Sequence, residues 1–140
     1  MLIYLTASDK ELSNYTNYHN VPALSREVMD NEAREIICEN FLSSFDYNDV
    51  PKLLEFIFNK IRLEGTLTIR EPDFNLISRQ FFREEVDTKL VNDIVFSENQ
   101  ILKCFLTLES VERLVPADRF KVVSKEFDSH NFTLKIKRIA

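Results

Sequence analysis

Residues 48–74 constrain the fold more than any other stretch, because the hydrophobic pattern changes its period within them. The first half repeats apolar side chains at steps of three and four, the spacing of one helix face: Val50, Leu53, Leu54, Ile57, Phe58 and Ile61. Pro51 suits a first helical turn, whose N–H groups have no partner within the helix. Residues 66–69 then alternate between polar and apolar side chains, as a half-buried strand does. We therefore predict a helix followed by a buried strand.

Gly65, the only glycine in the chain, lies between these two segments. Helices commonly end at a residue in the left-handed conformation, which glycine adopts without strain. We therefore expect Gly65 to end the helix, and Pro72 with Asp73 to end the strand. A helix that leads into a buried strand is one half of a βαβ unit, so the rest of the chain should supply neighbouring strands.

Short apolar or alternating runs elsewhere in the chain can supply those neighbours. The expected strands are residues 2–5, 15–19, 35–38, 66–69, 120–123 and 132–139. Polar residues at 128–131 favour a tight turn between the last two strands. This order predicts an α/β fold, with a mostly parallel sheet, helices on it and an antiparallel C-terminal hairpin. Residues 2–5, 36–38 and 67–69 should lie side by side at the centre of the sheet.

Further helical segments are expected on both sides of the central unit. A short helix or turn is expected within residues 25–34, and a longer helix at 107–115, with Thr107 as its N-cap. Apolar residues 90–96 should pack over an edge of the sheet, and 97–100 should form a polar turn. A Phe-rich stripe is expected to lie in the core or in a lid, or to form an interface if exposed: Phe74, Ile77, Phe81 and Phe82.

Length and composition limit the class of protein. The 140 residues, 44% hydrophobic and 29% charged, fit one soluble globular domain. A net charge of -5 argues against general nucleic-acid binding, which needs a basic face to displace counterions. No apolar run approaches the roughly 20 residues that span a bilayer, so membrane insertion is not expected. Charged residues at 9–11 interrupt the apolar start of the chain, so a signal peptide is not expected either. Cys38 and Cys104 lack further cysteines, which favours a reduced, cytoplasmic protein.

Several short motifs resemble those of the class I S-adenosylmethionine-dependent methyltransferases, especially small members from phages and polysaccharide loci. The family's opening Leu-x-Leu-Gly-x-Gly-Asp-Lys and Gly-Tyr-x-Asn-x-Asp resemble residues 2–19, with Asp9-Lys10 and Tyr15-x-Asn17 in register. Its Leu-x-Pro-Gly-Gly-x-Leu-x-Ile and Pro-Asp-Phe resemble residues 61–69 and 72–74. The resemblance covers the whole chain and implies a compact, Rossmann-like class I methyltransferase fold. It also implies S-adenosylmethionine as the cofactor.

The departures from the family fall where the cofactor is expected. Thr6 and Ser8 replace two family glycines, whose missing Cβ atoms let the backbone approach the methionine part of the cofactor. His19 replaces the acidic residue that would accept the ribose hydroxyls, and a histidine cannot offer a bidentate carboxylate. The family's Glu-His after its fourth strand is Ser43-Ser44 here. The resemblance therefore implies a vestigial cofactor site that consists of Thr6, Ala7, Ser8, Asp9, His19, Cys38 and Glu39.

Three functions remain open from the sequence. The first is a methyltransferase-like domain that has lost S-adenosylmethionine binding and acts as a scaffold or interaction module, with a protein partner or a second copy. The second is an active methyltransferase on a sugar or other small acceptor; its first strand begins almost at Met1, so no N-terminal cover for a substrate is expected. The third is a module that binds another small ligand in the same cleft, at the carboxyl ends of the strands.

No catalytic residue and no metal ligand is assigned. Cys38 has no histidine near it in sequence to activate it, so a buried structural role is expected. Cys38, Cys104, His19 and His130 lack the paired spacing of a zinc site. Basic side chains of the terminal hairpin are expected to form a solvated strand face, with a polyanion site as the alternative: Lys121, Lys125, Lys135, Lys137 and Arg138.

Overall fold

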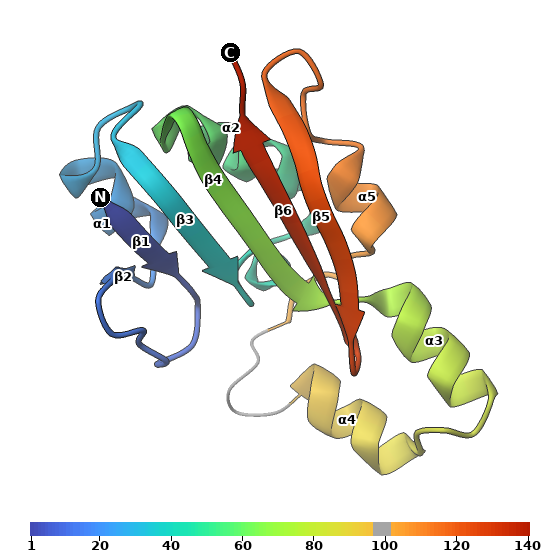
Figure 1. Ribbon diagram of the computed structural model, residues 1–140. Coiled ribbons are helices and arrows are strands. Elements are labelled where there is room, and N and C mark those ends of the chain that lie inside the picture. Colours follow the sequence, from blue (N-terminus) through green and yellow to red (C-terminus); the bar gives the residue numbers. More distant parts are fainter. Residues whose placement is uncertain (97–101) are drawn as a thin grey trace.

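The computed structural model describes residues 1–96 and 102–140 and contains one six-stranded sheet (Figure 1). The strands are β1 (Leu2–Leu5), β2 (Thr16–Tyr18), β3 (Ala33–Glu39), β4 (Ile61–Pro72), β5 (Phe120–Asp128) and β6 (Asn131–Arg138). Their order across the sheet is β2-β1-β3-β4-β6-β5. The first four strands pair in parallel, whereas β6 is antiparallel to both β4 and β5. The predicted α/β fold, with its mostly parallel sheet and antiparallel C-terminal pair, is confirmed.

The central strands lie in the predicted neighbourhood. Ile3 of β1 is opposite Ile36 of β3, and Ile36 is opposite Leu67 of β4. All three side chains are fully buried, because alternate residues of these strands point to the same, covered face of the sheet. The short β2, which pairs only with β1, forms one edge of the sheet.

Three helices cover this apolar face: α1 (Val21–Glu27), α2 (Val50–Lys60) and α5 (Leu108–Glu112), which lie behind the sheet in Figure 1. Two short 3₁₀ turns, Leu42–Ser44 and Tyr47–Asp49, lead into α2. Each helix contributes apolar side chains to the same core as the strands: Leu24 from α1, Leu53, Leu54, Ile57 and Phe58 from α2, and Val111 from α5. The periodic stripe that identified α2 is therefore its core-facing side.

The expected role of Gly65 is wrong. Helix α2 ends at Lys60, and β4 begins directly at Ile61. Gly65 lies within β4 and has no positive φ, whereas its neighbour Glu64 has a φ of 67°. A Cβ on Gly65 would lie 2.9 Å from the Arg62 carbonyl oxygen. The glycine is thus required for close packing at a β4 irregularity, where β3 and β4 change register.

Other boundaries also differ from expectation. Helix α1 begins at Val21, earlier than the expected 25–34, because the Asn20 side chain accepts a hydrogen bond from the Ala23 N–H. Helix α5 ends already at Glu112, although the predicted Thr107 cap is present with Ser110 in a reciprocal capping box. The polar turn expected at 97–100 lies outside the described residues.

Helices α3 (Phe74–Phe82) and α4 (Thr88–Phe96) project beyond the end of the sheet and lie beside each other (Figure 1). The core position predicted for the Phe-rich stripe of α3 is wrong, since only Ile77 of that stripe is buried. Asp73 fixes the start of α3, because its carboxylate accepts from the Leu76 N–H and also from the Leu108 N–H at the start of α5. One buried carboxylate therefore holds two helices at the end of β4.

The face of the sheet toward the viewer in Figure 1 is crossed by no helix of the described residues. The connection between β1 and β2, residues 6–15, contains no helix. Parallel sheets usually have both faces covered by crossover helices. In the part of the chain that the structure describes, helices therefore cover one face of this partly parallel sheet and leave the other without a helix. Within residues 1–96 and 102–140, no helix has the length and apolar character to cross a bilayer.

Candidate functional site

The candidate site lies where the order of strands reverses direction. From β1 the chain goes to β2 on one side, and it then returns through α1 to β3 on the other side. In open α/β sheets, ligands bind at such a point, in the crevice beside the carboxyl ends of the two diverging strands. Here the corresponding position, which we call the crevice, lies between residues 6–8 after β1 and residues 39–40 at the end of β3.

Thr6, Ser8 and His19 form a small polar cluster on the first side of this crevice. Thr6 is almost completely buried, and its hydroxyl lies 3.2 Å from the Ser8 hydroxyl and accepts from the Ser8 N–H at 3.3 Å. The His19 ring, through Nδ1, donates to the Thr6 carbonyl oxygen at 3.1 Å. Such side-chain bonds to a nearby backbone satisfy the polar groups of a turn without any ligand. The polar groups of Thr6, Ser8 and His19 are therefore hydrogen-bonded to one another and to the backbone nearby.

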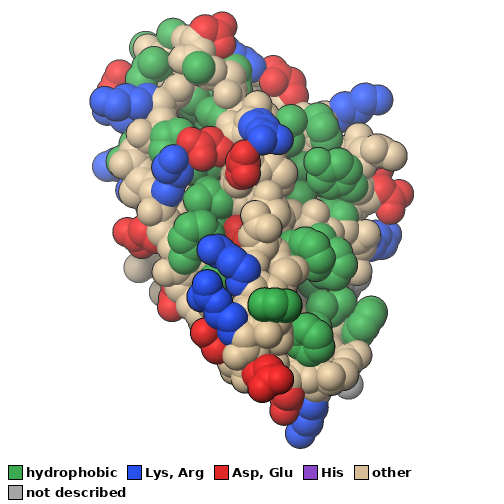
Figure 2. Space-filling view, turned by 90° about the vertical axis from the view of Figure 1, so that its right-hand side faces the viewer, with side chains coloured by type: hydrophobic (Ala, Val, Ile, Leu, Met, Phe, Trp, Pro, Cys, Tyr) green, Lys and Arg blue, Asp and Glu red, His purple; other side chains and the backbone are tan. Residues whose placement is uncertain are grey.

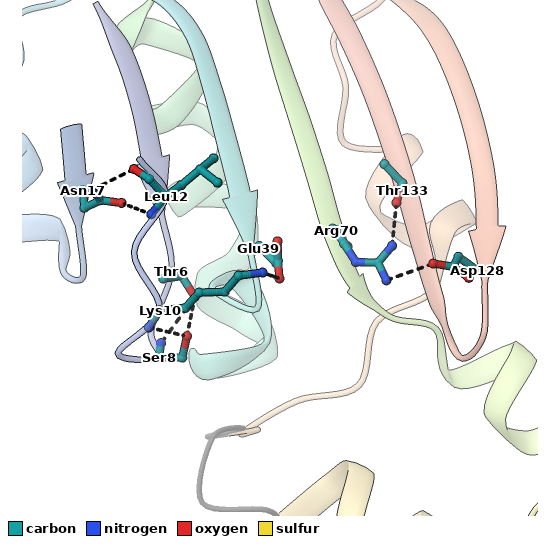
Figure 3. A network of polar contacts seen from close by, with 9 residues as sticks. All are labelled: Thr6, Ser8, Lys10, Leu12, Asn17, Glu39, Arg70, Asp128 and Thr133. Atoms are coloured by element: carbon teal, nitrogen blue, oxygen red, sulfur yellow. Dashed lines mark hydrogen bonds and ion pairs between the residues drawn. The ribbon is translucent and has the colours of Figure 1, made fainter. Parts of the chain in front are cut away.

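Direct contacts bridge the crevice itself. The Ala7 N–H donates to the Asn40 carbonyl oxygen at 3.4 Å, so the backbones that follow β1 and β3 touch. Lys10 reaches across the same gap, and its Nζ lies 3.1 Å from Glu39 Oε1 (Figure 3). The Glu39 side chain is mostly covered, whereas Lys10 remains more than half exposed. A ligand that entered between the strands would have to break both contacts.

Two buried polar atoms at the crevice have no hydrogen-bond partner among the described residues. They are the hydroxyl of Tyr4, a residue only 1% exposed, and Oδ1 of Asn40. Burial, followed by the charge of Glu39, raises the pKa of Tyr4 to about 12, so the phenol stays protonated; Glu39 and Thr6 lie near its hydroxyl without a well-formed hydrogen bond to it. Asn40 adopts a left-handed conformation, with a φ of 50°, which asparagine tolerates better than most residues. Buried polar atoms usually have partners, which makes this pair unusual.

The predicted site residues fall into three groups. Thr6, Ala7, Ser8 and His19 come together on one side of the crevice, and Glu39 lies on the other side. Asp9 is exposed and Cys38 is completely buried on the helix-covered face, where its neighbours in the sheet are Leu5 and Ile69. Burial, with the charge of Glu71 next, raises the pKa of the Cys38 thiol, which keeps it unreactive. Cys38 therefore does not belong to the crevice.

Lys10 and Tyr4 were not predicted as parts of this site, whereas Asn40 lies next to Glu39, in the segment that the resemblance placed at the cofactor. Tyr4 is the polar-tipped residue within the apolar run of β1, and its alternation with Ile3 and Leu5 places it on the uncovered face. That alternation was a usable signal for Tyr4. The contacts of Lys10 and Asn40 depend on how two loops fold toward each other, which no local pattern encodes.

A second polar centre lies behind the crevice, at the end of β4. Glu71 is fully buried, and its Oε1 accepts from the N–H groups of Phe41 and Leu42 at 2.9 and 2.8 Å. Its Oε2 accepts from the Ser43 hydroxyl at 2.7 Å. Burial raises the pKa of Glu71 to about 7, although all these hydrogen bonds act in the opposite direction. The carboxylate therefore holds the turn after β3, which contains Ser43 and Ser44.

Among the described residues, no group of three His, Cys, Asp or Glu side chains is arranged to hold a metal ion. The acidic and histidine side chains of the crevice are engaged with protein groups instead: Glu39 with Lys10, and His19 with the Thr6 carbonyl. The site has a polar lining, but its polar groups are mostly satisfied within the chain.

No family model matches the chain, and no curated protein matches its sequence. Solved structures do match its fold. One is an S-adenosylmethionine-dependent methyltransferase from Methanosarcina mazei, with a TM-score of 0.63, 10% identity, and coverage of 99% of this chain and 92% of the other. Another, from Thermotoga maritima, is also an S-adenosylmethionine-dependent methyltransferase, with a TM-score of 0.60, 12% identity, and coverage of 97% and 81%.

An O-methyltransferase family protein from Burkholderia thailandensis is similar as well, with a TM-score of 0.62 and 13% identity. The match covers 90% of this chain but only 36% of that protein, so this chain spans about a third of its length. At 10–13% identity these likenesses establish the fold alone. The chain thus has the Rossmann-like fold of class I methyltransferases, in a small version.

Proposed function

We propose that this chain is a methyltransferase-fold domain that no longer binds S-adenosylmethionine and acts as a scaffold or interaction module. The bridged crevice carries the proposal. The Ala7–Asn40 hydrogen bond and the Lys10–Glu39 ion pair join the two sides between which a cofactor would have to lie. Both Thr6 and Ser8 add side-chain atoms where the methyltransferases that the chain resembles have glycine.

The connection between β1 and β2 supports the same conclusion. In many α/β proteins the loop after the first strand leads into a helix, whose N-terminal N–H groups bind anionic parts of a ligand. Here that connection is residues 6–15 and has no helix. The crevice therefore lacks a helix N-terminus after β1 that could bind the cofactor's carboxylate.

Calorimetric titration with S-adenosylmethionine and with S-adenosylhomocysteine tests this function. We expect no heat of binding up to millimolar concentrations of either compound. Micromolar binding of either compound would contradict the proposal and favour an active methyltransferase. The positive control is an established methyltransferase of the same fold under the same conditions.

The Tyr4 hydroxyl and Asn40 Oδ1 favour a second candidate, a small polar ligand other than S-adenosylmethionine. Each is buried at the crevice and lacks a partner among the described residues, so each could bind a polar ligand atom once Lys10 moves aside. The test is a thermal-shift screen of nucleosides, sugars and amino acids on the wild type and on Tyr4→Phe. A ligand that uses this hydroxyl stabilises the wild type and loses most of that effect in Tyr4→Phe. If every compound shifts both proteins equally, or neither, this second candidate is wrong.

A further inference from the structure

Glu71 is an acid buried without a positive charge beside it. Its side chain has no exposed surface, and it takes part in none of the ion pairs between described residues. Arg70, its neighbour in the sequence, lies on the opposite face of β4, where its guanidinium bonds to Thr133 and Asp128 (Figure 3). An ionised Glu71 is therefore a buried charge without a counter-ion, which is a costly state in a protein interior.

The other titratable groups around Glu71 and its contacts add no positive charge. They are the thiols of Cys38 in β3 and Cys104 before α5, and the carboxyl groups of Asp46 and Asp73. Burial raises the pKa of both thiols, so neither is charged at neutral pH. A further acidic group can only oppose the ionisation of Glu71, and the residue opposite it on β6 is Phe132.

Both forms of the Glu71 carboxyl group can hold the turn after β3. The N–H groups of Phe41 and Leu42 donate to Oε1, which accepts in either form. The Ser43 hydroxyl lies 2.7 Å from Oε2; it donates when Glu71 is ionised and accepts when Glu71 is protonated. Burial raises the pKa of Glu71 to about 7, although these hydrogen bonds lower it. The closed turn therefore binds the proton more tightly than a solvated glutamate does, whose pKa is 4.5.

A second contact carries this effect beyond the turn. The carbonyl oxygen of Ser43 accepts from the N–H groups of Lys103 and Cys104, at 2.7 and 3.2 Å. These two residues precede α5 and are more than fifty positions away in the sequence. Glu71, residues 41–44 and residues 103–104 are thus connected in series.

We propose that Glu71 is a proton-operated switch, which holds residues 41–44 against residues 103–104 when it is protonated and releases them when it is ionised. Release brings water to the carboxylate and removes the cost of the buried charge. The sheet stays folded, because the groups that bond to Glu71 belong to the turn after β3 and to no strand. The switch is a local opening within the folded chain.

Release changes an exposed apolar surface. Phe105, which follows the released residues, is 49% exposed and stacks on Phe74, with 4.6 Å between the ring centroids. Phe74 begins α3, and Figure 2 shows the side of the molecule that includes α3, α5 and β5, where hydrophobic side chains gather. Leu42 is fully buried in the closed turn and becomes accessible when the turn opens. The proton on Glu71 thereby controls how much apolar surface this region presents.

The direction and size of the effect follow from the two pKa values. Because the closed form binds the proton more tightly, opening becomes more favourable as the pH rises from 4.5 to 7, and it levels off above 7. One proton with these pKa values increases the opening equilibrium constant about 40-fold between pH 5 and pH 7. Between pH 7 and pH 8 the further increase is only about twofold.

Amide hydrogen exchange followed by NMR tests the switch. The exchange rates of the N–H groups of Phe41, Leu42, Lys103 and Cys104 are divided into those of an unstructured peptide at the same pH, which gives a protection factor. This factor should fall about 40-fold from pH 5 to pH 7, and it should stay below that of the β6 amides throughout. Protection equal to that of β6 would show global unfolding alone, and protection independent of pH would show that Glu71 does not control the opening. Either result would overturn the proposal.

Glu71→Gln should keep the turn closed at every pH, because the glutamine amide imitates the protonated carboxyl group. Its protection factors should vary less than about twofold between pH 5 and pH 7, in contrast to the wild type. If this variant shows the pH profile of the wild type, the proposal is wrong.

A pair of serine variants tests the switch independently, even if Glu71→Gln fails to fold. Ser43→Ala removes a hydroxyl that lowers the pKa of Glu71, so protection should continue to fall above pH 7. Ser44→Ala is the matched control, since the Ser44 hydroxyl donates to the Phe41 carbonyl oxygen and makes no hydrogen bond to Glu71. Its protection should level off at pH 7, as in the wild type. Identical profiles for the two variants would contradict the switch.

Discussion

The Ser43 hydroxyl donates to the buried carboxylate of Glu71 across 2.7 Å, and this bond joins the turn after β3 to the end of β4. Two N–H groups of the same turn donate to the other oxygen of Glu71, so the side chain is fully engaged, although among the described residues it forms no ion pair. The free energy of unfolding therefore depends on pH, because the pKa of Glu71 differs between the folded and the unfolded chain.

Glu71→Gln should remove this pH dependence. In the folded chain burial raises the pKa of Glu71 from 4.5 to about 7, so the folded state holds its proton more tightly than the unfolded state. The tighter proton binding of Glu71 in the folded state therefore stabilises the fold fully below pH 4.5, and this stabilisation is lost as the pH rises through 7. A shift of this size corresponds to about 3 kcal/mol. Urea unfolding from pH 5 to 8 should show a flatter curve for Glu71→Gln than for the wild type. The exposed control Glu11→Gln should follow the wild type, and parallel curves for Glu71→Gln and the wild type would refute the prediction.

Replacing Thr6 and Ser8 together by glycine should not restore S-adenosylmethionine binding. The change removes two side chains from the crevice but leaves the Ala7–Asn40 hydrogen bond and the Lys10–Glu39 ion pair in place. Each new glycine should cost about 0.5–1 kcal/mol of stability through greater freedom of the unfolded chain. Calorimetric titration measures binding and urea unfolding measures stability. Micromolar binding by the double variant would mean that the two side chains alone had blocked the site.

Asp73→Ala should destabilise the fold by about 2–4 kcal/mol, since it removes the N-cap of α3 and the acceptor for the first N–H of α5, and it leaves two N–H groups without partners. Asp49→Ala is the matched control. Asp49 precedes α2 in the same way, but its side chain makes no capping hydrogen bond, so its loss should cost less than about 0.5 kcal/mol. Urea unfolding compares the two variants, and equal losses would contradict the role assigned to Asp73.

Gly65→Ala should destabilise the chain by about 1–3 kcal/mol, the usual range for overpacking. The new Cβ would lie 2.9 Å from both the Arg62 carbonyl oxygen and Ile61 Cγ2, and 3.0 Å from the Ala33 carbonyl oxygen. Glu64→Gly is the control, because relief of the strained φ of 67° offsets the greater freedom of the unfolded chain. Its stability, measured by urea unfolding, should change by less than about 1 kcal/mol. A Gly65→Ala variant as stable as the wild type would show that the strands can separate there at little cost.

The regular elements of this fold could be predicted because local patterns encode them. The apolar run at residues 2–5 and the stripe from Val50 to Phe58 correspond to β1 and the buried face of α2. Gly65 was misassigned because a lone glycine fits two physical needs, a left-handed helix end and a close approach of backbones. Here Glu64 takes the left-handed conformation and Gly65 the close approach.

The candidate site was predicted only in part, because several of its contacts join residues that are far apart in the sequence. Thr6, Ser8 and His19 were identified through the resemblance, and the structure brings them together. The loss of cofactor binding stays a prediction. The role of Glu71 was hidden, because its partners Phe41 and Ser43 are about thirty residues away in sequence. A signal did exist, since the alternation of Leu67 and Ile69 places Glu71 on the inward face of β4. A charged residue at an inward strand position needs such partners.

The order of the strands has a consequence for solubility. In the sheet that the described residues form, β2 and β5 lie at the edges, where unpaired backbone groups could pair with strands of other molecules. Strand β2 is three residues long, and β5 has an irregularity between Val122 and Ser124 and exposed lysines at 121 and 125. Both edges thus resist the backbone-to-backbone growth that produces fibrils. Crowded or partly unfolded preparations of this chain should therefore lack the roughly 4.8 Å repeat of stacked strands.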